Sequence, residues 1–311
     1  VRFFYSLFRL LILLSVGFVI IYPLFYMIVG AIQSKYAVLN STRLWIPTDF
    51  AIVENFTAAY KALYYSEALI STLKNAIIPA LLQVCSCAVA AYGFARFNFK
   101  GKKLRLAILF LTILVPDMML IIPRVVNFAH LDLAGVLGLL NRVTGVDLRV
   151  NIFNTSWTFW LPSLLGIGLR SGFLIFIYIQ FFKSLPHELE EAAWVDGAGP
   201  FRTFLSIAIP SSGVVILTVT ILSLIWHWND SLLSGMYLTG DYPIAVRLGF
   251  LRTTLASMFK IYVTPTNPQA MGYLMAGCVL FVAPMLIFYM IVPKYTDYEA
   301  HCISIDIGFE F

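Results

Sequence analysis

The most informative stretch of the sequence is residues 184–210, which read SLPHELEEAAWVDGAGPFRTFLSIAIP. Pro186 suits the start of a helix, because the N–H that it lacks is not needed in the first turn. The macrodipole of such a helix favours anions near its start, where three glutamates follow: Glu188, Glu190 and Glu191. Gly197 and the pair Gly199–Pro200 favour a break. The pattern predicts a short helix, a bend and a second helix that runs to Pro210.

Long apolar runs lie on both sides of this stretch. Of the 311 residues, 60% are hydrophobic and 12% are charged, whereas a soluble domain is about half apolar and about one quarter charged. The runs are continuous rather than alternating, which favours membrane-spanning helices over a β-barrel. Spans close to the roughly 20 residues that a bilayer requires are predicted at about residues 8–32, 68–94, 104–122, 157–182, 204–225 and 271–291.

These six spans predict an all-α membrane protein with a single transmembrane domain over residues 1–311. The first run is too long for a secretory signal peptide and has no small-residue cleavage site, so we expect a retained helix. The short segment 96–105, RFNFKGKKLR, is densely basic and is therefore expected to stay in the cytoplasm. With six spans, this orientation places both termini and the loop 183–203 in the cytoplasm.

The charge and the cysteines give no sign of another class of protein. The net charge of +5 suits the basic cytoplasmic ends of a membrane protein. No basic stripe with interleaved aromatic residues lies outside the spans, so we expect no nucleic-acid binding. Cys85 and Cys87 would point to different faces of a helix. Neither the four cysteines nor the four histidines fall at metal-ligand spacing, and we expect no metal site.

The anchor positions of the informative stretch match a known motif. The triplet EAA at residues 191–193 is followed after three residues by Gly197, and at fixed spacing by Ile207 and Pro210. This pattern resembles the EAA loop of the permease subunits of bacterial ABC importers, the binding-protein-dependent transport system inner membrane components. The fuller form, EAA-x-x-DGA, resembles the carbohydrate-uptake branch and is similar to the maltose-type permeases.

Further stretches extend the resemblance over most of the chain. They resemble the family's AAYxFAR helix ending, its MxP…IP pair and its WNDxxxPL signature, and they lie at residues 90–97, 115–123 and 226–230. The sequence departs from the last signature where Ser234 and Gly235 replace the usual Pro-Leu. The tail at residues 295–311 also lacks the usual Gly-rich ending, so we assign it no role.

The resemblance implies the type I ABC importer permease fold, in which a cytoplasmic coupling helix contacts a separate ATPase. Glu191 would make polar contacts to the ATPase, and the small Ala192 and Ala193 would allow close approach. Gly197 would supply the bend, with Asp196 bracing it. The residues carried over to this coupling role are Glu191, Ala192, Ala193, Asp196, Gly197 and Ala198.

The chain has no GxxxxGK[ST] sequence, nucleophile elbow or HExxH pair, so we expect no enzymatic activity and no bound cofactor. The resemblance implies that two cytoplasmic ATPase subunits use ATP and Mg²⁺. It also implies a second, homologous permease subunit and an extracytoplasmic solute-binding protein. We expect a heterodimer in a bacterial cytoplasmic membrane, although the residues themselves do not distinguish a heterodimer from a homodimer.

Polar residues within or beside the spans are candidates for the substrate path, because such residues are costly in lipid. Aromatic rings can stack on sugar faces, and amide and carboxylate groups can bond hydroxyls. The candidates are Asp117, Trp226, Trp228, Asn229 and Asp230. An interfacial aromatic belt with a polar helix end explains the last four equally well.

Two alternatives remain open. A permease for a non-sugar solute would share the core EAA pattern. An anionic cargo would favour basic residues within the spans, where Arg170 is the main candidate, so a neutral cargo such as a sugar, oligosaccharide or polysaccharide is preferred. An ion-driven secondary transporter would instead show buried carboxylates in paired spans and internal repeats. One doubtful acid and no clear repeat are present.

Overall fold

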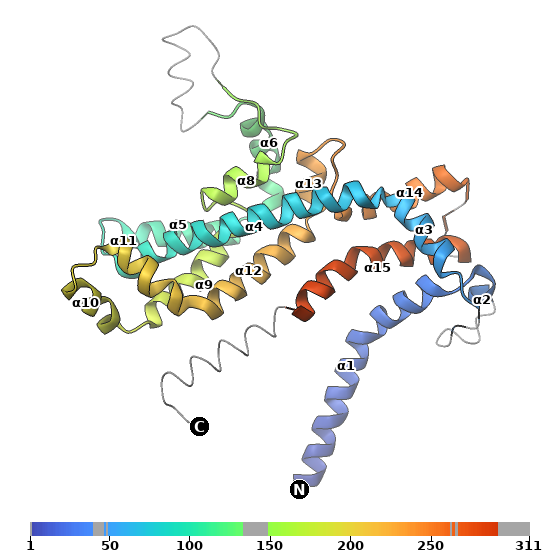
Figure 1. Ribbon diagram of the computed structural model, residues 1–311, viewed down its shortest axis with the longest axis horizontal. Helices are drawn as coiled ribbons and strands as arrows, with labels where there is room; N and C mark the ends of the chain where they lie inside the picture. Colours follow the sequence, from blue (N-terminus) through green and yellow to red (C-terminus); the bar gives the residue numbers. More distant parts are fainter. Residues whose placement is uncertain are drawn as a thin grey trace. The chain divides into compact units, whose positions relative to one another are not determined.

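The computed structural model describes residues 2–39, 47, 49–132, 149–261, 263–264 and 267–291, most of which are helical (Figure 1). The tail at residues 295–311 lies outside this part of the chain. The chain divides into two compact units. The first comprises Val1–Leu69 and Ile244–Ile291, and the described part of the second is Ile70–Pro243.

The first unit is built around a long apolar helix. Its elements are α1 (Arg2–Ile32), α2 (Lys35–Leu39), α3 (Ile52–Leu63), the start of α4 (Tyr65–Arg96), α14 (Ile244–Phe259) and α15 (Pro268–Ile291). Large apolar side chains are exposed along α1 from Phe4 to Ile28, as expected for a helix in lipid. Near its end, Gly30 packs against Met275 of α15, where a Cβ atom would collide with the methionine sulfur. The amide of Asn55 donates to the carbonyls of Ala31 and Gln33 at 2.9 and 2.8 Å, which fixes α3 against the end of α1.

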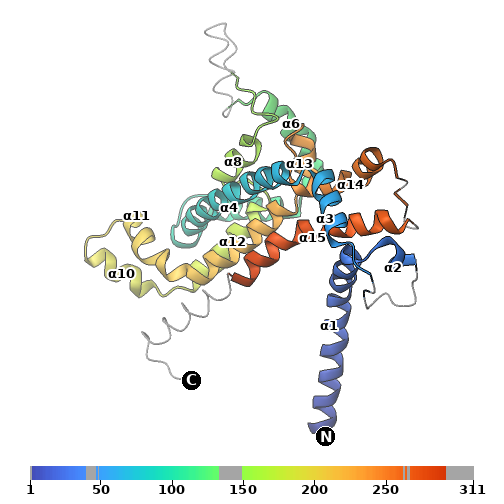
Figure 2. The same cartoon turned by 45° about the vertical axis from the view of Figure 1, so that its right-hand side comes forward.

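The second unit carries the features discussed below. Its elements are the rest of α4, α5 (Lys102–Leu114), η2 (Asp117–Leu120), α6 (Ile121–Ala129), α8 (Trp157–Leu164), α9 (Ser171–Ser184), α10 (His187–Val195), α11 (Pro200–Thr203), η3 (Phe204–Ala208), η4 (Pro210–Ser212), α12 (Gly213–Trp228) and α13 (Leu232–Tyr237). Helices α4, α9 and α12 share one apolar core, in which Tyr178, Phe182 and Val219 are fully buried. Figures 1 and 2 show α10 and α11 at one end of this unit and α6, α8 and α13 at another.

The helices differ from the six continuous spans that hydropathy predicts. Among the described residues, four helices are long and apolar enough to cross a membrane: Phe4–Ile32, Tyr65–Arg96, Pro210–Trp228 and Pro268–Ile291. The expected third span, 104–122, is bent. Its two parts, Lys102–Leu114 and Asp117–Ala129, meet at 100° and would make a fifth span if counted as one. Val115 is extended because the proline that follows it disfavours helical backbone.

The expected fourth span, 157–182, is two short helices rather than one. Helix α8 ends at Leu164, α9 begins at Ser171, and residues 165–170 between them are not helical. Gly166 has a φ of 71° and Arg170 a φ of 53°, both in the left-handed region that interrupts a right-handed helix. Hydropathy does not detect this break, because the interrupting residues lie inside one apolar run.

The expected fifth span, 204–225, also begins differently. The regular helix α12 starts only at Gly213, after the π-helical turn η3 and the 3₁₀ turn η4. Pro210 has no N–H to continue the ladder, and the amide of Ile209 bonds to the carbonyl of Phe204, five residues back.

A buried glutamine forms hydrogen bonds at the break between α8 and α9. The Gln83 amide nitrogen, on α4, donates to the carbonyl of Leu169 and to the hydroxyl of Ser171, both at 2.7 Å. Its carbonyl oxygen accepts from the hydroxyl of Ser223 on α12 at 2.6 Å. Gln83 is fully buried, so no solvent competes for these bonds. One side chain therefore joins α4, α12 and the non-helical segment.

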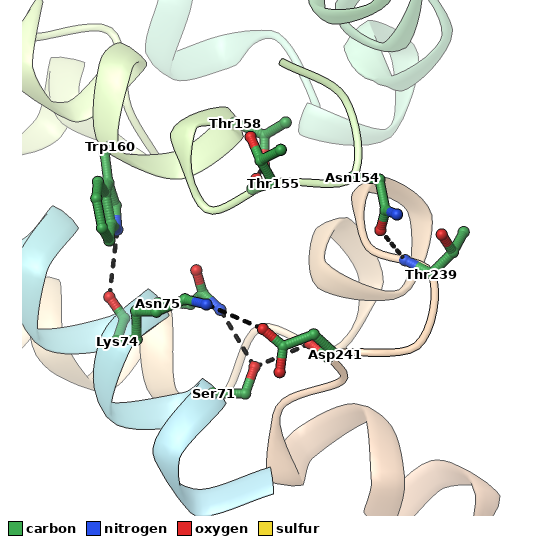
Figure 3. A network of polar contacts seen from close by, with 9 residues as sticks. All are labelled: Ser71, Lys74, Asn75, Asn154, Thr155, Thr158, Trp160, Thr239 and Asp241. Carbon is green, nitrogen blue, oxygen red and sulfur yellow. Dashed lines mark hydrogen bonds and ion pairs between the residues drawn. The ribbon is translucent and has the colours of Figure 1, made fainter. Parts of the chain in front are cut away.

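A second polar network binds the other part of α4 to the segment after α13 (Figure 3). The ammonium group of Lys74 lies 3.0 Å from the Asp241 carboxylate, and the Ser71 hydroxyl donates to the Asp241 carbonyl at 2.9 Å. The indole N–H of Trp160 on α8 donates to the carbonyl of Lys74 at 3.3 Å. These contacts hold α4, α8 and the segment containing Asp241 together.

Candidate functional site: a loop helix and a polar cavity

The loop between α9 and α12 contains a short helix. Helix α10 starts at His187, directly after Pro186, and ends at Val195. Gly197 has a φ of 80°, and a Cβ atom there would meet open space, so the glycine is needed for its backbone conformation alone. Helix α11 then begins with Pro200 in its first turn. The chain thus forms a helix, a turn and a second short helix.

The residues expected to contact an ATPase lie on the open surface of this loop. Glu191, Ala192, Asp196 and Gly197 are exposed, and Ala193 and Ala198 are half-buried. Three large apolar side chains of α10 are exposed beside them: Leu189, Trp194 and Val195. This exposed surface combines acidic and apolar side chains, and protein-docking surfaces likewise combine apolar and polar groups. No ligand pocket is needed for such a role.

Sequence reasoning missed two residues at the base of α10. The side chains of Arg96 and Glu190 are only 4% and 3% exposed, and Nε of Arg96 lies 2.9 Å from Oε1 of Glu190. Arg96 ends the AAYGFAR stretch and begins the basic segment 96–105, and neither pattern indicates a partner for its charge. Glu190 directly precedes Glu191, and consecutive helical residues point about 100° apart. That spacing indicates that the two glutamates point in different directions.

The second unit also holds a cavity of about 1070 Å³. It lies among α5, η2, the start of α9, the end of α12 and the start of α13. Four of the five expected substrate-path residues line it: Asp117, Trp226, Asn229 and Asp230. Trp228 does not line it; it is 4% exposed, on another side of α12. The structure therefore brings four of these residues together and separates the fifth.

The charged groups around this cavity have close partners. Arg124 contacts Asp117 at 3.3 Å between Nη1 and Oδ1, and the Arg170 guanidinium lies 5.0 Å from the ring centre of Trp226. Asp230 accepts from the amides of Leu233 and Ser234 at 3.0 and 2.9 Å, at the start of α13. Burial raises the pKa of the Asp230 carboxyl, and these hydrogen bonds oppose the rise.

The cavity is lined by aromatic, amide, carboxylate and guanidinium groups. A smaller cavity of about 300 Å³ shares Arg124 and Asp230 with it and is lined by His227 and Tyr237. Within the described residues, no group of three His, Cys, Asp or Glu side chains is placed to hold a metal ion. The chemistry present suits reversible binding of a polar solute through hydrogen bonds and ring contacts.

Known proteins are similar to this chain in sequence and in fold. The chain is 27% identical over 241 residues to the trehalose transport system permease protein SugB of Mycobacterium tuberculosis, covering 78% of this chain and 77% of that one. It is 25% identical over 272 residues to AmyC of Thermoanaerobacterium thermosulfurigenes, a probable starch degradation products transport system permease, covering 88% and 86%. The fold matches a chain in the crystal structure of a bacterial ABC transporter that imports the acidic polysaccharide alginate, with a TM-score of 0.66, 18% identity and 94% and 96% of the two chains covered.

The model of one family matches residues 83–297, which is more than half of the chain. This region includes the loop helix α10, the cavity and most of the apolar helices. The chain therefore belongs to the family of binding-protein-dependent transport system inner membrane components, and is a multi-pass membrane protein with a transport role rather than an enzymatic one.

Proposed function

We propose that this chain forms half of the translocation pathway of a bacterial ABC importer for a sugar, oligosaccharide or polysaccharide. One observation carries the proposal: a chain of this family presents the EAA residues on an exposed helix outside its apolar spans. The names of the trehalose and starch-product relatives support a carbohydrate cargo. The cavity supports it too, since Trp226 and Asn229 supply the ring and amide groups that bind sugars.

The loop helix α10 is the element proposed to couple transport to a separate ATPase. Glu191 projects from the loop and would make polar contacts in a groove of the ATPase. Ala192 and Ala193 are small and would allow close approach, while Gly197 sets the bend, with Asp196 and Ala198 beside it. Closure of the two ATPases on ATP and Mg²⁺ would move α10 and bias the permease between its inward-open and outward-open states.

The other subunits of the complex and its membrane topology follow from this proposal. A second, homologous permease would complete a heterodimer, and an extracytoplasmic binding protein would deliver the cargo. The single domain over residues 1–311 would cross the bacterial cytoplasmic membrane six times, with the bent segment from α5 to α6 and the broken pair α8–α9 each counted as one crossing. Both termini and the loop 183–203 would be cytoplasmic, as the basic segment 96–105 favours.

The test is ATP-dependent uptake of labelled sugars by proteoliposomes that contain this chain and its co-purified subunits. Glu191→Ala should leave the chain folded but lower the uptake per ATP hydrolysed. Gly197→Ala should act in the same direction, because alanine is strained at a φ of 80°. Gly199→Ala is the matched control, since Gly199 has a φ of −74° and open space at its Cβ position.

The outcomes separate the alternatives. Uptake of phosphorylated or other non-sugar solutes in place of sugars would keep the importer and replace its cargo. Uptake that follows a proton or sodium gradient without an ATPase would reject the importer. Equal activity of Gly197→Ala and Gly199→Ala would show that the bend at residue 197 does not matter for coupling.

A further inference from the structure

Two neighbouring glutamates of α10 lie in opposite surroundings. Glu191 is exposed, whereas Glu190 is 2% exposed. The Glu190 carboxylate forms an ion pair with the Arg96 guanidinium, although Nε of Arg96 does not make an aligned hydrogen bond to it. The hydroxyl of Tyr92 donates to Oε1 of Glu190 at 3.2 Å. Both contacting residues belong to the last turns of α4.

Arg96 contacts two further residues besides the Glu190 carboxylate. Its Nη2 donates to the carbonyl of Leu185 at 2.8 Å, immediately before α10 begins. Its Nη1 lies 3.1 and 3.2 Å from the two ring nitrogens of His187, the first residue of α10. The guanidinium therefore reaches the entry, the first residue and the buried face of the loop helix. Such a fork of donors is specific to arginine, because a lysine ammonium is a single point charge.

Helix α4 continues from this contact into the core of the second unit. Tyr92 packs against Phe182 and Phe204 with ring centres 5.5 and 4.9 Å apart, and Gln83 bonds to Leu169 at the α8–α9 break. The same helix thus contacts α10 at one end and the break beside the cavity further along. A displacement of α10 would be transmitted to α4 by a buried charged contact rather than by a flexible loop.

We propose that Arg96 is a positioning residue that locks α10 to the end of α4 through Glu190. The adjacent glutamates then have different roles. Glu190 is buried and joins the loop helix α10 to α4, whereas Glu191 is exposed on the surface of the loop. The inference that α10 is held by this pair stands on the contacts alone. Its part in coupling rests on the proposed function.

Hydrogen exchange of the intact, purified chain in lipid nanodiscs tests the lock without any transport assay. Arg96→Gln and Glu190→Gln should each speed exchange of the α10 amides by about tenfold or more, because the helix then opens locally. Glu188→Gln, the same change at an exposed position of the same helix, should leave that exchange unchanged. Unaltered exchange over α9 (residues 171–184) would show that the fold is retained. Unchanged α10 exchange in both variants would overturn the lock.

Arg96→Lys separates charge from geometry and serves if the glutamine variant does not fold. It keeps the positive charge but loses the fork, so α10 exchange should fall between that of the wild type and of Glu190→Gln. Protection equal to the wild type would mean that any cation suffices and that the contacts to Leu185 and His187 do nothing.

The part in coupling is tested in the reconstituted complex. Glu190→Gln should keep the ATPase subunit bound and hydrolysing, but lower the sugar imported per ATP by about tenfold, since the moving helix is no longer tied to α4. An equal fall in hydrolysis and uptake would overturn this part. If the wild-type complex shows no ATP-dependent uptake while α10 exchange responds as expected, the proposed function fails and the lock stands.

Discussion

Two carboxylates of the second unit are withdrawn from solvent in different ways. Glu190, at the base of α10, faces the positive charge of Arg96 and the hydroxyl of Tyr92. Asp230, beside the cavity, faces neutral donors: the amides of Leu233 and Ser234 and the Ser234 hydroxyl. The first contact joins segments far apart in the sequence, and the second is confined to one turn.

The difference shows what each group stabilises. An arginine reaching from α4 can hold a whole loop helix in place, and removing it would leave an uncompensated buried charge. Amides at the start of α13 fix only a short local helix, and they compensate burial incompletely, so the pKa of the Asp230 carboxyl remains raised. Glu190 therefore stabilises the contact between α4 and α10, which are distant in sequence, and Asp230 stabilises the local shape of the cavity wall.

The largest effect is expected from Arg96→Met, which leaves the Glu190 carboxylate buried without its cation. The free energy of unfolding should fall by about 3–5 kcal/mol, the usual cost of removing one partner of a buried pair. Unfolding in mixed detergent micelles, followed by circular dichroism, measures it. The double variant Arg96→Met with Glu190→Leu should recover most of the loss. A fall of less than about 1 kcal/mol for the single variant would mean that the ion pair contributes no more than a solvent-exposed ion pair.

A smaller loss is expected from Asp230→Ala, which removes the acceptor from the first amides of α13. Loss of such a cap costs about 1 kcal/mol in the free energy of unfolding. Asp230→Asn is the matched control, because its amide oxygen can still accept one of these bonds. The same unfolding measurement applies. A loss as large as that of Arg96→Met would erase the distinction between the two carboxylates.

The raised pKa of Asp230 predicts that the contribution of this carboxyl to stability falls as the pH rises. Protonation of Asp230 is more favourable in the folded than in the unfolded chain, so its stabilising contribution is complete below the unfolded pKa of about 3.9 and is lost as the pH rises through the folded pKa. The stability of wild type minus that of Asp230→Asn should therefore decrease with rising pH, by at most about 1.4 kcal/mol per pH unit. Thermal unfolding at pH 4 to 7 measures it. An increase with pH would mean that the hydrogen bonds outweigh burial.

The smallest effect on stability is expected from Glu191→Gln. Its side chain is exposed, and surface substitutions usually change the free energy of unfolding by less than about 0.5 kcal/mol. The same change at Glu190 should be far more damaging. Parallel unfolding curves of the two variants test the contrast directly. Similar losses for both would contradict the different burial of these neighbours.

The sequence predicts the membrane class and the family well, because both depend on features that survive without contacts. Long apolar runs indicate spans, and the spaced EAA pattern indicates the family. The breaks were not predictable from hydropathy. Residues 165–170 lie in an apolar run, and the donor to the Leu169 carbonyl comes from Gln83, which is distant in sequence. The bend after Leu114 had a visible signal in Pro116, but the angle depends on tertiary packing.

Within the candidate site, the type of residue was easier to predict than its partner. Asp117 and Asp230 were recognised as costly groups near lipid, and both line the cavity. Trp228 was grouped with Trp226 because they are near in sequence, but two positions apart on a helix point to different faces. Glu190 was overlooked because its partner, Arg96, lies on a different helix and had a sufficient explanation as a topology signal.

The hydrogen bonds of Gln83 at the α8–α9 break have a consequence for how the helices assemble. In lipid, every backbone polar group needs a partner within the protein. The carbonyl of Leu169 acquires its donor only when Gln83 arrives on α4. The break between α8 and α9 therefore has this donor only where α4 packs against it, so the packing of α4 completes the joint between the two short helices.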